Sequence, residues 1–158
     1  MVVYVDDIII TGSDITEVGS VKAHLDSLFG IKDLGTLSYF LRIEVVRLLE
    51  DIFLSRKKFT NELLAQTGFA TFTPAVTPLP LNYKLLPEDG SLLLDPTHYK
   101  TIIDKVNFLT HTRPDLSFTI QTLSQFIQAP RDSHLHALLH VLRYLKGTVG
   151  HDIVLKGF

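Results

Sequence analysis

Two adjacent aspartates, Asp6 and Asp7, interrupt a run of apolar and mostly β-branched residues near the start of the chain. Val-Val-Tyr-Val precedes the pair and Ile-Ile-Ile follows it, a pattern that predicts two short strands joined by a tight turn. One continuous buried strand would instead place two carboxylates in a core, at roughly several kcal/mol unless they are paired or hold a metal. We therefore expect a hairpin over residues 2–11 that presents both carboxylates at its tip.

Carboxylate oxygens at an exposed tip are ligands for hard divalent cations, and this is the local chemistry of two-metal nucleotidyl transfer. An Asp-Asp pair alone is a weak signal, because acidic turns that do nothing are common on protein surfaces. The more informative feature is the whole string Tyr4-Val5-Asp6-Asp7, followed by Ile8-Ile9-Ile10-Thr11-Gly12.

The composition is that of a folded domain. The 158 residues are 46% apolar and 20% charged, which is enough for one sizeable core or two small lobes. The net charge of −2 means that nucleic-acid binding would depend on local basic patches. The absence of cysteine excludes disulfides, thiolate metal sites and a cysteine nucleophile. No run approaches the roughly 18 apolar residues of a membrane span, and no signal peptide is evident, so we expect a soluble intracellular domain without a membrane partner.

Local signals predict the elements that follow the hairpin. Ser13 or Asp14 can cap a helix over 15–29 that ends at Gly30. Residues 37–48 and 52–55 predict a second antiparallel hairpin, and a helix over 57–67 should stop at Gly68. Five of the seven prolines lie in 73–97, which predicts a linker between lobes. Helices should then cover 97–110, 115–128 and 132–146.

Several residues have structural interpretations. Asp115 should cap the helix that follows Pro114, and Arg143 and Lys146 lie near a helix C-terminus, where the helix dipole favours cations. Contact with nucleic acid is the second interpretation for these two cations. His136 and His140 have the spacing of a zinc pair, but no third ligand is suggested nearby. Residue 2 begins a strand with nothing before it, and Asp152-Ile153-Val154-Leu155 begins a strand without a partner. We therefore expect both ends of the sequence to be truncated.

Further short motifs follow one another along the chain. They are Lys32-Asp33-Leu34-Gly35, Tyr39-Phe40-Leu41, Ile43-Glu44-Val45, Ile52-Phe53-Leu54-Ser55, Thr77-Pro78-Leu79-Pro80, Thr112-Arg113-Pro114-Asp115, Leu123-Ser124-Gln125-Phe126 and Val141-Leu142-Arg143-Tyr144-Leu145-Lys146-Gly147-Thr148. With the Tyr-x-Asp-Asp box at residues 4–7, the chain resembles the reverse transcriptase of copia-type LTR retrotransposons, and specifically fragments of such polyproteins scattered through plant genomes.

The resemblance implies an α+β fold, in which part of a reverse-transcriptase palm with an antiparallel sheet precedes an all-helical thumb. The implied boundaries are the C-terminal half of the palm at 1–72, a Pro-rich linker at 73–96, the thumb at 97–146, and the truncated start of a connection toward ribonuclease H at 147–158.

The resemblance also implies an activity, which is nucleotidyl transfer from a dNTP to a primer 3′-end with Mg²⁺, or alternatively Mn²⁺. Asp6 would bind both metal ions, Asp7 would be its less constrained neighbour, and Lys32 would lie near the phosphates as a general acid. The family has a further metal-binding aspartate upstream of the box, which a chain beginning three residues before the box cannot contain. We therefore expect the chain to be inactive alone. Its partners would be RNA/DNA template–primer, dNTP, and the missing fingers, palm half and ribonuclease H segments.

Other residues would face nucleic acid by the same resemblance. Tyr4 would press on the primer terminus, and Phe40-Leu41-Arg42 would grip the primer, although related sequences usually read Phe-Leu-Gly there. Arg42 in place of glycine could contact a phosphate, but loss of close fit is the favoured interpretation.

A helical face formed by Lys100, Asp104 and Phe108 would follow the minor groove of the duplex. The family usually has glycine where Asp104 stands, so this carboxylate should weaken duplex binding. Two alternatives to a polymerase fragment remain open. One is a residual nucleic-acid-binding module, and the other is an inert or repurposed protein-interaction domain with a large exposed apolar face.

Overall fold

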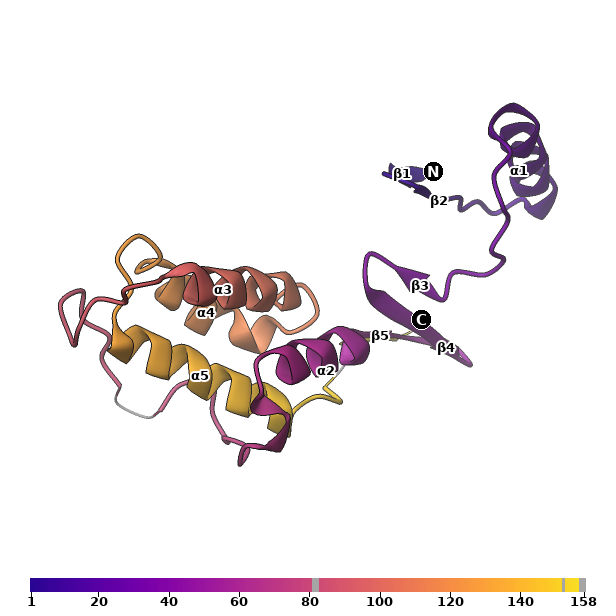
Figure 1. The fold of residues 1–158 in the computed structure, drawn as a ribbon. Helices are drawn as coiled ribbons and strands as arrows, with labels where there is room; N and C mark the ends of the chain where they lie inside the picture. The colour runs from indigo at the N-terminus through magenta and orange to yellow at the C-terminus, as the bar shows by residue number, and fades with distance from the viewer. Residues whose placement is uncertain (81–82, 152, 157–158) are drawn as a thin grey trace. The chain divides into compact units, whose positions relative to one another are not determined.

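The computed structural model describes residues 1–80, 83–151 and 153–156 (Figure 1). The chain divides into two compact units, Met1–Leu41 and Arg42–Phe158. Parts of the segments predicted as linker (73–96) and connection (147–158) lie outside the described residues, namely residues 81–82, 152 and 157–158. The fold is mixed α+β with antiparallel sheets, as predicted.

The first unit contains the predicted hairpin and helix. Strands β1 (Val2–Tyr4) and β2 (Asp7–Ile9) pair antiparallel, with Val2 opposite Ile9 and Tyr4 opposite Asp7. Helix α1 (Ile15–Phe29) begins at Asp14, whose carboxylate accepts a hydrogen bond of 2.8 Å from the Thr16 amide. It ends at Gly30, which has a φ of 61°. A short strand, β3 (Tyr39–Phe40), follows.

The first unit has no buried residue, and residues 1–41 are all described. Large apolar side chains on both the hairpin and α1 are exposed, among them Val5 at 80%, Ile15 at 86% and Phe29 at 70%. The hydrophobic effect therefore contributes little to holding this unit together, and local capping and strand hydrogen bonds carry most of its order.

The second unit begins with a sheet centred on β5. Strands β4 (Ile43–Leu48) and β5 (Asp51–Ser55) form the predicted second hairpin. Strand β6 (Ile153–Leu155) pairs antiparallel with the other edge of β5, with Ile153 opposite Leu54. The expectation that the C-terminal strand has no partner is therefore wrong for residues 153–155, because a pairing across about a hundred residues leaves no local signal. Asp152 lies outside the described residues.

Helices make up the rest of the second unit. They are α2 (Lys57–Gln66), the 3₁₀ turn η1 (Phe69–Thr71), α3 (Thr97–Leu109), the 3₁₀ turn η2 (Pro114–Leu116), α4 (Ser117–Ser124) and α5 (Asp132–Gly147). The helix predicted over 115–128 is shorter than expected, and Asp115 is not its cap, because its carboxylate binds Arg113 and Tyr144 instead. Among the described residues, no helix is both long enough and apolar enough to cross a membrane.

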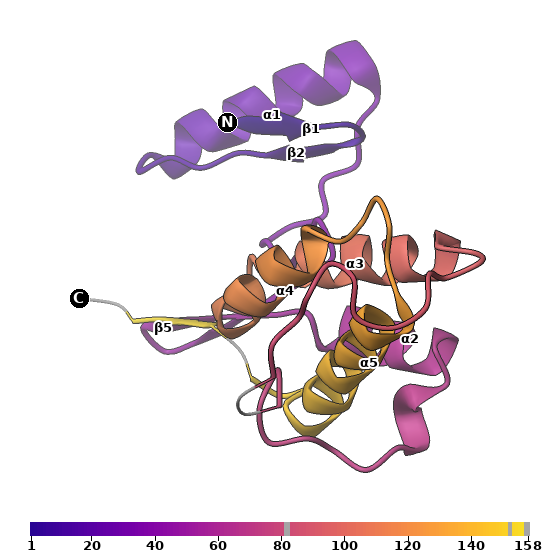
Figure 2. The same cartoon turned by 90° about the vertical axis from the view of Figure 1, so that its left-hand side faces the viewer.

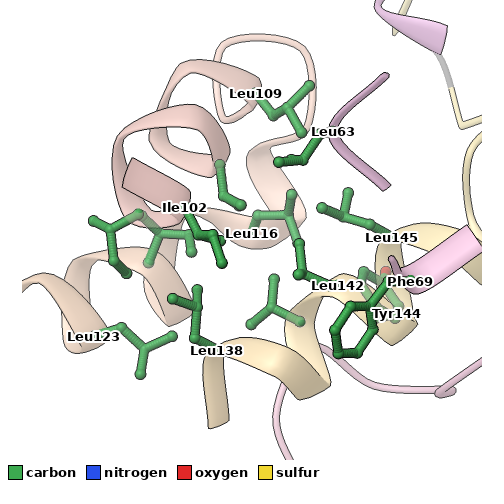
Figure 3. Packing of buried hydrophobic residues seen from close by; sticks show 14 of the residues in the cluster. Leu63, Phe69, Ile102, Leu109, Leu116, Leu123, Leu138, Leu142, Tyr144 and Leu145 are labelled. Atoms are coloured by element: carbon green, nitrogen blue, oxygen red, sulfur yellow. The ribbon is translucent and has the colours of Figure 1, made fainter. Parts of the chain in front are cut away.

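The core of the second unit lies between these helices (Figure 3). Leu138, Leu142 and Leu145 are fully buried on one face of α5, at the i, i+4 and i+7 spacing of an amphipathic helix. Leu63 of α2, Ile102 of α3 and Leu123 of α4 pack into the same cluster. Burial of each such side chain stabilises the fold by about 1.5–3 kcal/mol.

The Pro-rich segment is bound along α5. Residues 72–80 and 83–96, here called the strap, connect η1 to α3 within the second unit and pass beside α5 (Figure 2). Arg143 donates Nε–H to the Thr73 carbonyl at 2.9 Å, and Lys146 donates to the Phe72 carbonyl at 2.7 Å. A Cβ on Gly147 would lie 3.0 Å from Cβ of Pro74, so glycine allows the strap to approach the end of α5 closely.

Candidate active site

The tip of the β1–β2 hairpin carries the two aspartates. Val5 and Asp6 form the two-residue turn, which the Tyr4–Asp7 pair closes. Val5 has a φ of 48°, a left-handed conformation that is unfavourable for a β-branched residue. Residues held in such conformations store of order 1–3 kcal/mol and cluster at functional sites. Tyr4, Asp6 and Asp7 are all exposed, so the predicted exposed acidic turn is confirmed.

The register places Tyr4 and Asp7 on the same face of the hairpin, because residues directly opposite each other in an antiparallel pair point to one side. Asp6 projects from the turn itself. A metal ion at the tip would thus meet a carboxylate from the turn and a ring and carboxylate from the strand face.

The donor atoms at the tip suit a hard divalent cation, but their number does not complete a site. Mg²⁺ takes six oxygen ligands in near-octahedral geometry. Across the part of the chain that the structure describes, no cluster of three or more carboxylate, imidazole or thiolate side chains is placed to hold a metal. Asp6 and Asp7 are therefore at most part of a ligand set.

Lys32 is exposed in the loop that follows α1. Its neighbour Asp33 fixes that loop, since the carboxylate accepts hydrogen bonds from the Gly35 amide at 2.9 Å and from Lys22 Nζ at 3.0 Å. These two hydrogen bonds hold the pKa of Asp33 below its ordinary value. The loop is thus ordered locally, and Lys32 presents its ammonium group to solvent.

The turn between β3 and β4 contains Leu41 and Arg42. Leu41 and Arg42 have φ values of 49° and 61°, in the left-handed region that glycine adopts without steric penalty. The guanidinium of Arg42 lies 5.4 Å from the ring centroid of Phe59, in cation–π geometry. Phe40 and Leu41 are half-buried. Arg42 therefore adds both a strained backbone and a bulky cation to the predicted primer-gripping turn.

The three predicted positions on α3 differ in what they offer. Asp104 is exposed and Lys100 is half-buried. The ring of Phe108 is committed to the interior, because it packs edge-on against Phe59 at 5.3 Å and carries the guanidinium of Arg56 on its face. Of this face, Asp104 and Lys100 have side chains open to a ligand, whereas Phe108 contributes packing.

The histidines of α5 have structural partners. His134 is fully buried, where its Nδ1 accepts from the Arg131 amide at 3.1 Å and its Nε2 donates to the Leu86 carbonyl at 2.9 Å. His140 Nε2 contacts the Thr77 carbonyl at 3.0 Å. Both rings therefore attach α5 to the strap. Sequence reasoning missed that His136, His140 and Arg143 line a pocket with Phe72 and Tyr83, although their helical spacing was a signal.

Comparison with known proteins finds a family match that includes the hairpin. The family model described as reverse transcriptase (RNA-dependent DNA polymerase) matches residues 1–80, which include it. The "Retrovirus-related Pol polyprotein from transposon RE1" of Arabidopsis thaliana is 43% identical over 99% of this chain and 11% of its own length. An uncharacterized mitochondrial protein of the same plant is 35% identical over 97% of this chain and 63% of its own length.

A further relative is the Pol polyprotein from transposon TNT 1-94 of Nicotiana tabacum, which is 30% identical over the whole chain and 13% of its own length. The chain thus spans only about a tenth of the curated polyproteins that it matches. No solved structure matches it. The exposed acidic hairpin, the family match that covers it, and these relatives lead to one conclusion: the chain belongs to the reverse transcriptase (RNA-dependent DNA polymerase) family, in the branch found in retrotransposon Pol polyproteins.

Proposed function

We propose that the β1–β2 hairpin supplies metal-binding carboxylates to the active site of an RNA-directed DNA polymerase, and that this chain does not polymerise alone. Asp6 is the main metal ligand, Asp7 its neighbour, Tyr4 contacts the primer terminus, and Lys32 lies near the dNTP phosphates. The observation that carries the proposal is the strained, exposed turn with its two carboxylates, inside the segment that matches the family. When bound, the metal ions would activate the primer hydroxyl and stabilise the leaving pyrophosphate.

The proposal assigns residues 1–72 to the palm, 73–96 to the linker and 97–146 to the thumb, with 147–158 leading toward ribonuclease H. Reverse transcriptases act on a nucleic-acid template–primer and generally use divalent metal ions. Two carboxylates leave most of a magnesium coordination sphere open, and we infer that a further protein carboxylate, as the family resemblance implies, is supplied by polypeptide upstream of the Tyr-Val-Asp-Asp string in the polyprotein.

Primer extension tests both halves of the proposal. The assay uses a poly-rA template, an oligo-dT primer, dTTP and Mg²⁺, with the chain alone and then with the upstream fingers and palm segment of a transposon Pol relative. We expect no incorporation by the chain alone and incorporation once the upstream segment is added. Asp6→Asn should abolish that activity, while Asp89→Asn, an exposed aspartate on the strap, should leave it unchanged. If the chain alone incorporates dTTP and Asp6→Asn abolishes that incorporation, the proposed inactivity of the isolated chain is wrong.

A protein-interaction role is the second candidate, and the surface of the first unit favours it. In residues 1–41, eleven large apolar side chains are exposed, from Met1 and Val2 on the hairpin to Leu34 and Tyr39 after α1. Exposed apolar surface of this kind marks interaction sites or drives self-association. Sedimentation of the wild type beside a Val3→Ser, Ile15→Ser, Phe29→Ser variant tests this role. If the wild type sediments as a monomer and its sedimentation coefficient does not change with an added partner, the interaction role is wrong. Only the polymerase-fragment proposal then remains.

A further inference from the structure

A pocket of about 420 Å³ opens between the strap and α5, and all the residues described as lining it belong to the second unit. This volume lies in the range of about 300–1,000 Å³ that is typical of small-ligand sites. The pocket combines two kinds of wall, one aromatic and one polar. The residues that define it are Phe69, Phe72, Tyr83, His136, His140 and Arg143.

The aromatic wall is partly open to solvent. Phe69 is buried and stacks on Phe72, with ring centroids 4.4 Å apart and an angle of 15° between the planes. Phe72 itself is 49% exposed. Tyr83 is held at its far end, because its hydroxyl donates to the Ser133 carbonyl at 3.3 Å. The exposed part of the Phe72 ring therefore offers a surface on which a flat ligand can stack.

The polar wall belongs to α5, and Arg143 is the one formally charged residue among the described residues that line the pocket. His136, His140 and Arg143 lie at i, i+4 and i+7, on one side of the helix. The Nε–H bond from Arg143 to the Thr73 carbonyl fixes the plane of the guanidinium. Its two terminal nitrogens have no hydrogen-bond partner among the residues that the structure describes, so the fork that suits a phosphate is open.

The charge in the pocket has one sign. Among the described lining residues none is acidic, whereas the chain as a whole carries a net charge of −2. An anionic ligand is thus favoured locally and not by the overall field. A stacking surface next to a guanidinium is the combination by which proteins hold one nucleotide of a single strand, since each base offers a flat face next to a phosphate.

We propose that this pocket binds one nucleotide of a single-stranded nucleic acid, with the base stacked on Phe72 and a phosphate on Arg143. A base inside a duplex has both faces covered by its neighbours, so double-stranded nucleic acid cannot make the same contact. The proposal goes beyond the polymerase function, because it uses no residue of the β1–β2 hairpin and requires no metal.

Fluorescence anisotropy with a labelled single-stranded oligo-dT, titrated with the full chain without metal, tests the pocket. We expect binding that weakens with KCl, and a roughly tenfold loss of affinity in Arg143→Gln, as for one charge-assisted contact. The slope of log affinity against log salt should fall by about 0.7, which is one phosphate of a single strand. Phe72→Leu keeps the apolar contact with Phe69 but removes the exposed ring, and should weaken binding about fivefold or more.

Matched variants separate the pocket from general charge. Arg47→Gln removes the same charge from an exposed position on β4 and should change affinity less than twofold. The titration contains no metal and no dNTP, whereas primer extension requires both, so failure of this inference is distinguishable from failure of the polymerase proposal. Equal losses in Arg47→Gln and Arg143→Gln, tighter binding of duplex than of single strand, or no binding by the folded wild type would each overturn the assignment. Arg143→Lys provides a second test if Arg143→Gln does not fold, because it keeps the charge but loses the fork.

Discussion

The guanidinium of Arg56 lies on the ring of Phe108, with its central carbon 3.8 Å from the ring centroid. Arg56 is only 6% exposed, and its Nη1 donates to the carbonyl oxygen of the same phenylalanine. Among the residues that the structure describes, its buried Nε has no hydrogen-bond partner and no carboxylate forms an ion pair with it. Desolvation accordingly lowers the pKa of Arg56. The ring and one carbonyl therefore offset only part of the free-energy penalty of burying this cation.

Replacing Arg56 by methionine should stabilise the second unit. The substitution removes a buried charge that has no carboxylate partner among the described residues, and such burial costs free energy, whereas it forfeits a cation–π contact of about 0.5–2 kcal/mol. We expect Arg56→Met to raise the free energy of unfolding by about 1 kcal/mol in urea denaturation. Arg42→Met, which removes an exposed cation near Phe59, should change it by less than about 0.5 kcal/mol. A less stable Arg56→Met protein would show that the contacts with Phe108 outweigh desolvation.

The turn between β4 and β5 offers a second substitution that should raise the free energy of unfolding. Leu49 has a φ of 53° and is fully exposed, so its side chain contributes strain without packing. Glycine relieves about 1–2 kcal/mol of left-handed strain but loses roughly 0.5–1 kcal/mol more backbone entropy on folding. Leu49→Gly should therefore stabilise the protein by about 0.5–1 kcal/mol in thermal or urea unfolding. Leu49→Ala keeps a Cβ in the strained conformation and should leave the free energy of unfolding unchanged. Equal gains in stability in Leu49→Gly and Leu49→Ala would show that relief of backbone strain is not the cause.

Elements with local signals could be predicted from the sequence. Asp14 and Gly30 bracket α1 because capping hydrogen bonds and a left-handed glycine act within a few residues of each helix end. The β1–β2 hairpin was evident because a charged pair between apolar runs has few other low-energy arrangements. The resemblance then supplied the candidate site, which geometry alone could not have supplied, since the described residues contain no cluster of three or more potential metal ligands.

The strap could not be predicted, because its partners lie far along the chain. Proline content and the lack of periodicity indicated a linker, whereas the hydrogen bonds that attach the segment run to α5 side chains such as Arg143. His134 illustrates the same limit. Nothing local to His134 indicates that its ring stacks on Phe126, with ring centroids 3.9 Å apart, and links Arg131 to Leu86. Only the tertiary structure brings these groups together.

Asp104 gives a direct test of the predicted nucleic-acid face of α3. The carboxylate is exposed, so it would lie near phosphates if this face followed a duplex. Removing one like charge at about 4 Å in water is worth about 1 kcal/mol, or roughly fivefold in affinity. Asp104→Asn should therefore bind a primer–template duplex about fivefold more tightly at low salt, as measured by anisotropy, with a smaller gain at high salt. Glu62→Gln, an exposed acid of α2, is the control, and an equal gain in both variants would indicate net charge alone.

Asp115 joins the start of α4 to the end of α5. Its two carboxylate oxygens accept from Arg113 Nε at 3.0 Å and Nη2 at 2.7 Å, and Tyr144 donates to the second oxygen at 2.9 Å. Arg113 is 4% exposed and also donates to the Thr148 carbonyl at 2.9 Å. Burial raises the pKa of Asp115, but the hydrogen bonds from Arg113 and Tyr144 outweigh it and hold that pKa below its ordinary value.

The lowered pKa fixes the sign of a pH dependence. Because the carboxyl group is more acidic in the folded than in the unfolded chain, its stabilisation is fully present above about pH 4 and is lost as the pH falls through the folded pKa. Asp115→Asn leaves Arg113 buried without its anion and should lower the free energy of unfolding by about 2 kcal/mol at pH 7, a modest value because Asp115 is partly exposed. Urea unfolding at pH 7, 4 and 2.5 should show the variant losing less stability between pH 4 and 2.5 than the wild type does. Asp89→Asn should lose the same stability as the wild type at each pH. If Asp115→Asn and the wild type lose equal stability between pH 4 and 2.5, the Asp115 carboxylate is not a source of the pH dependence.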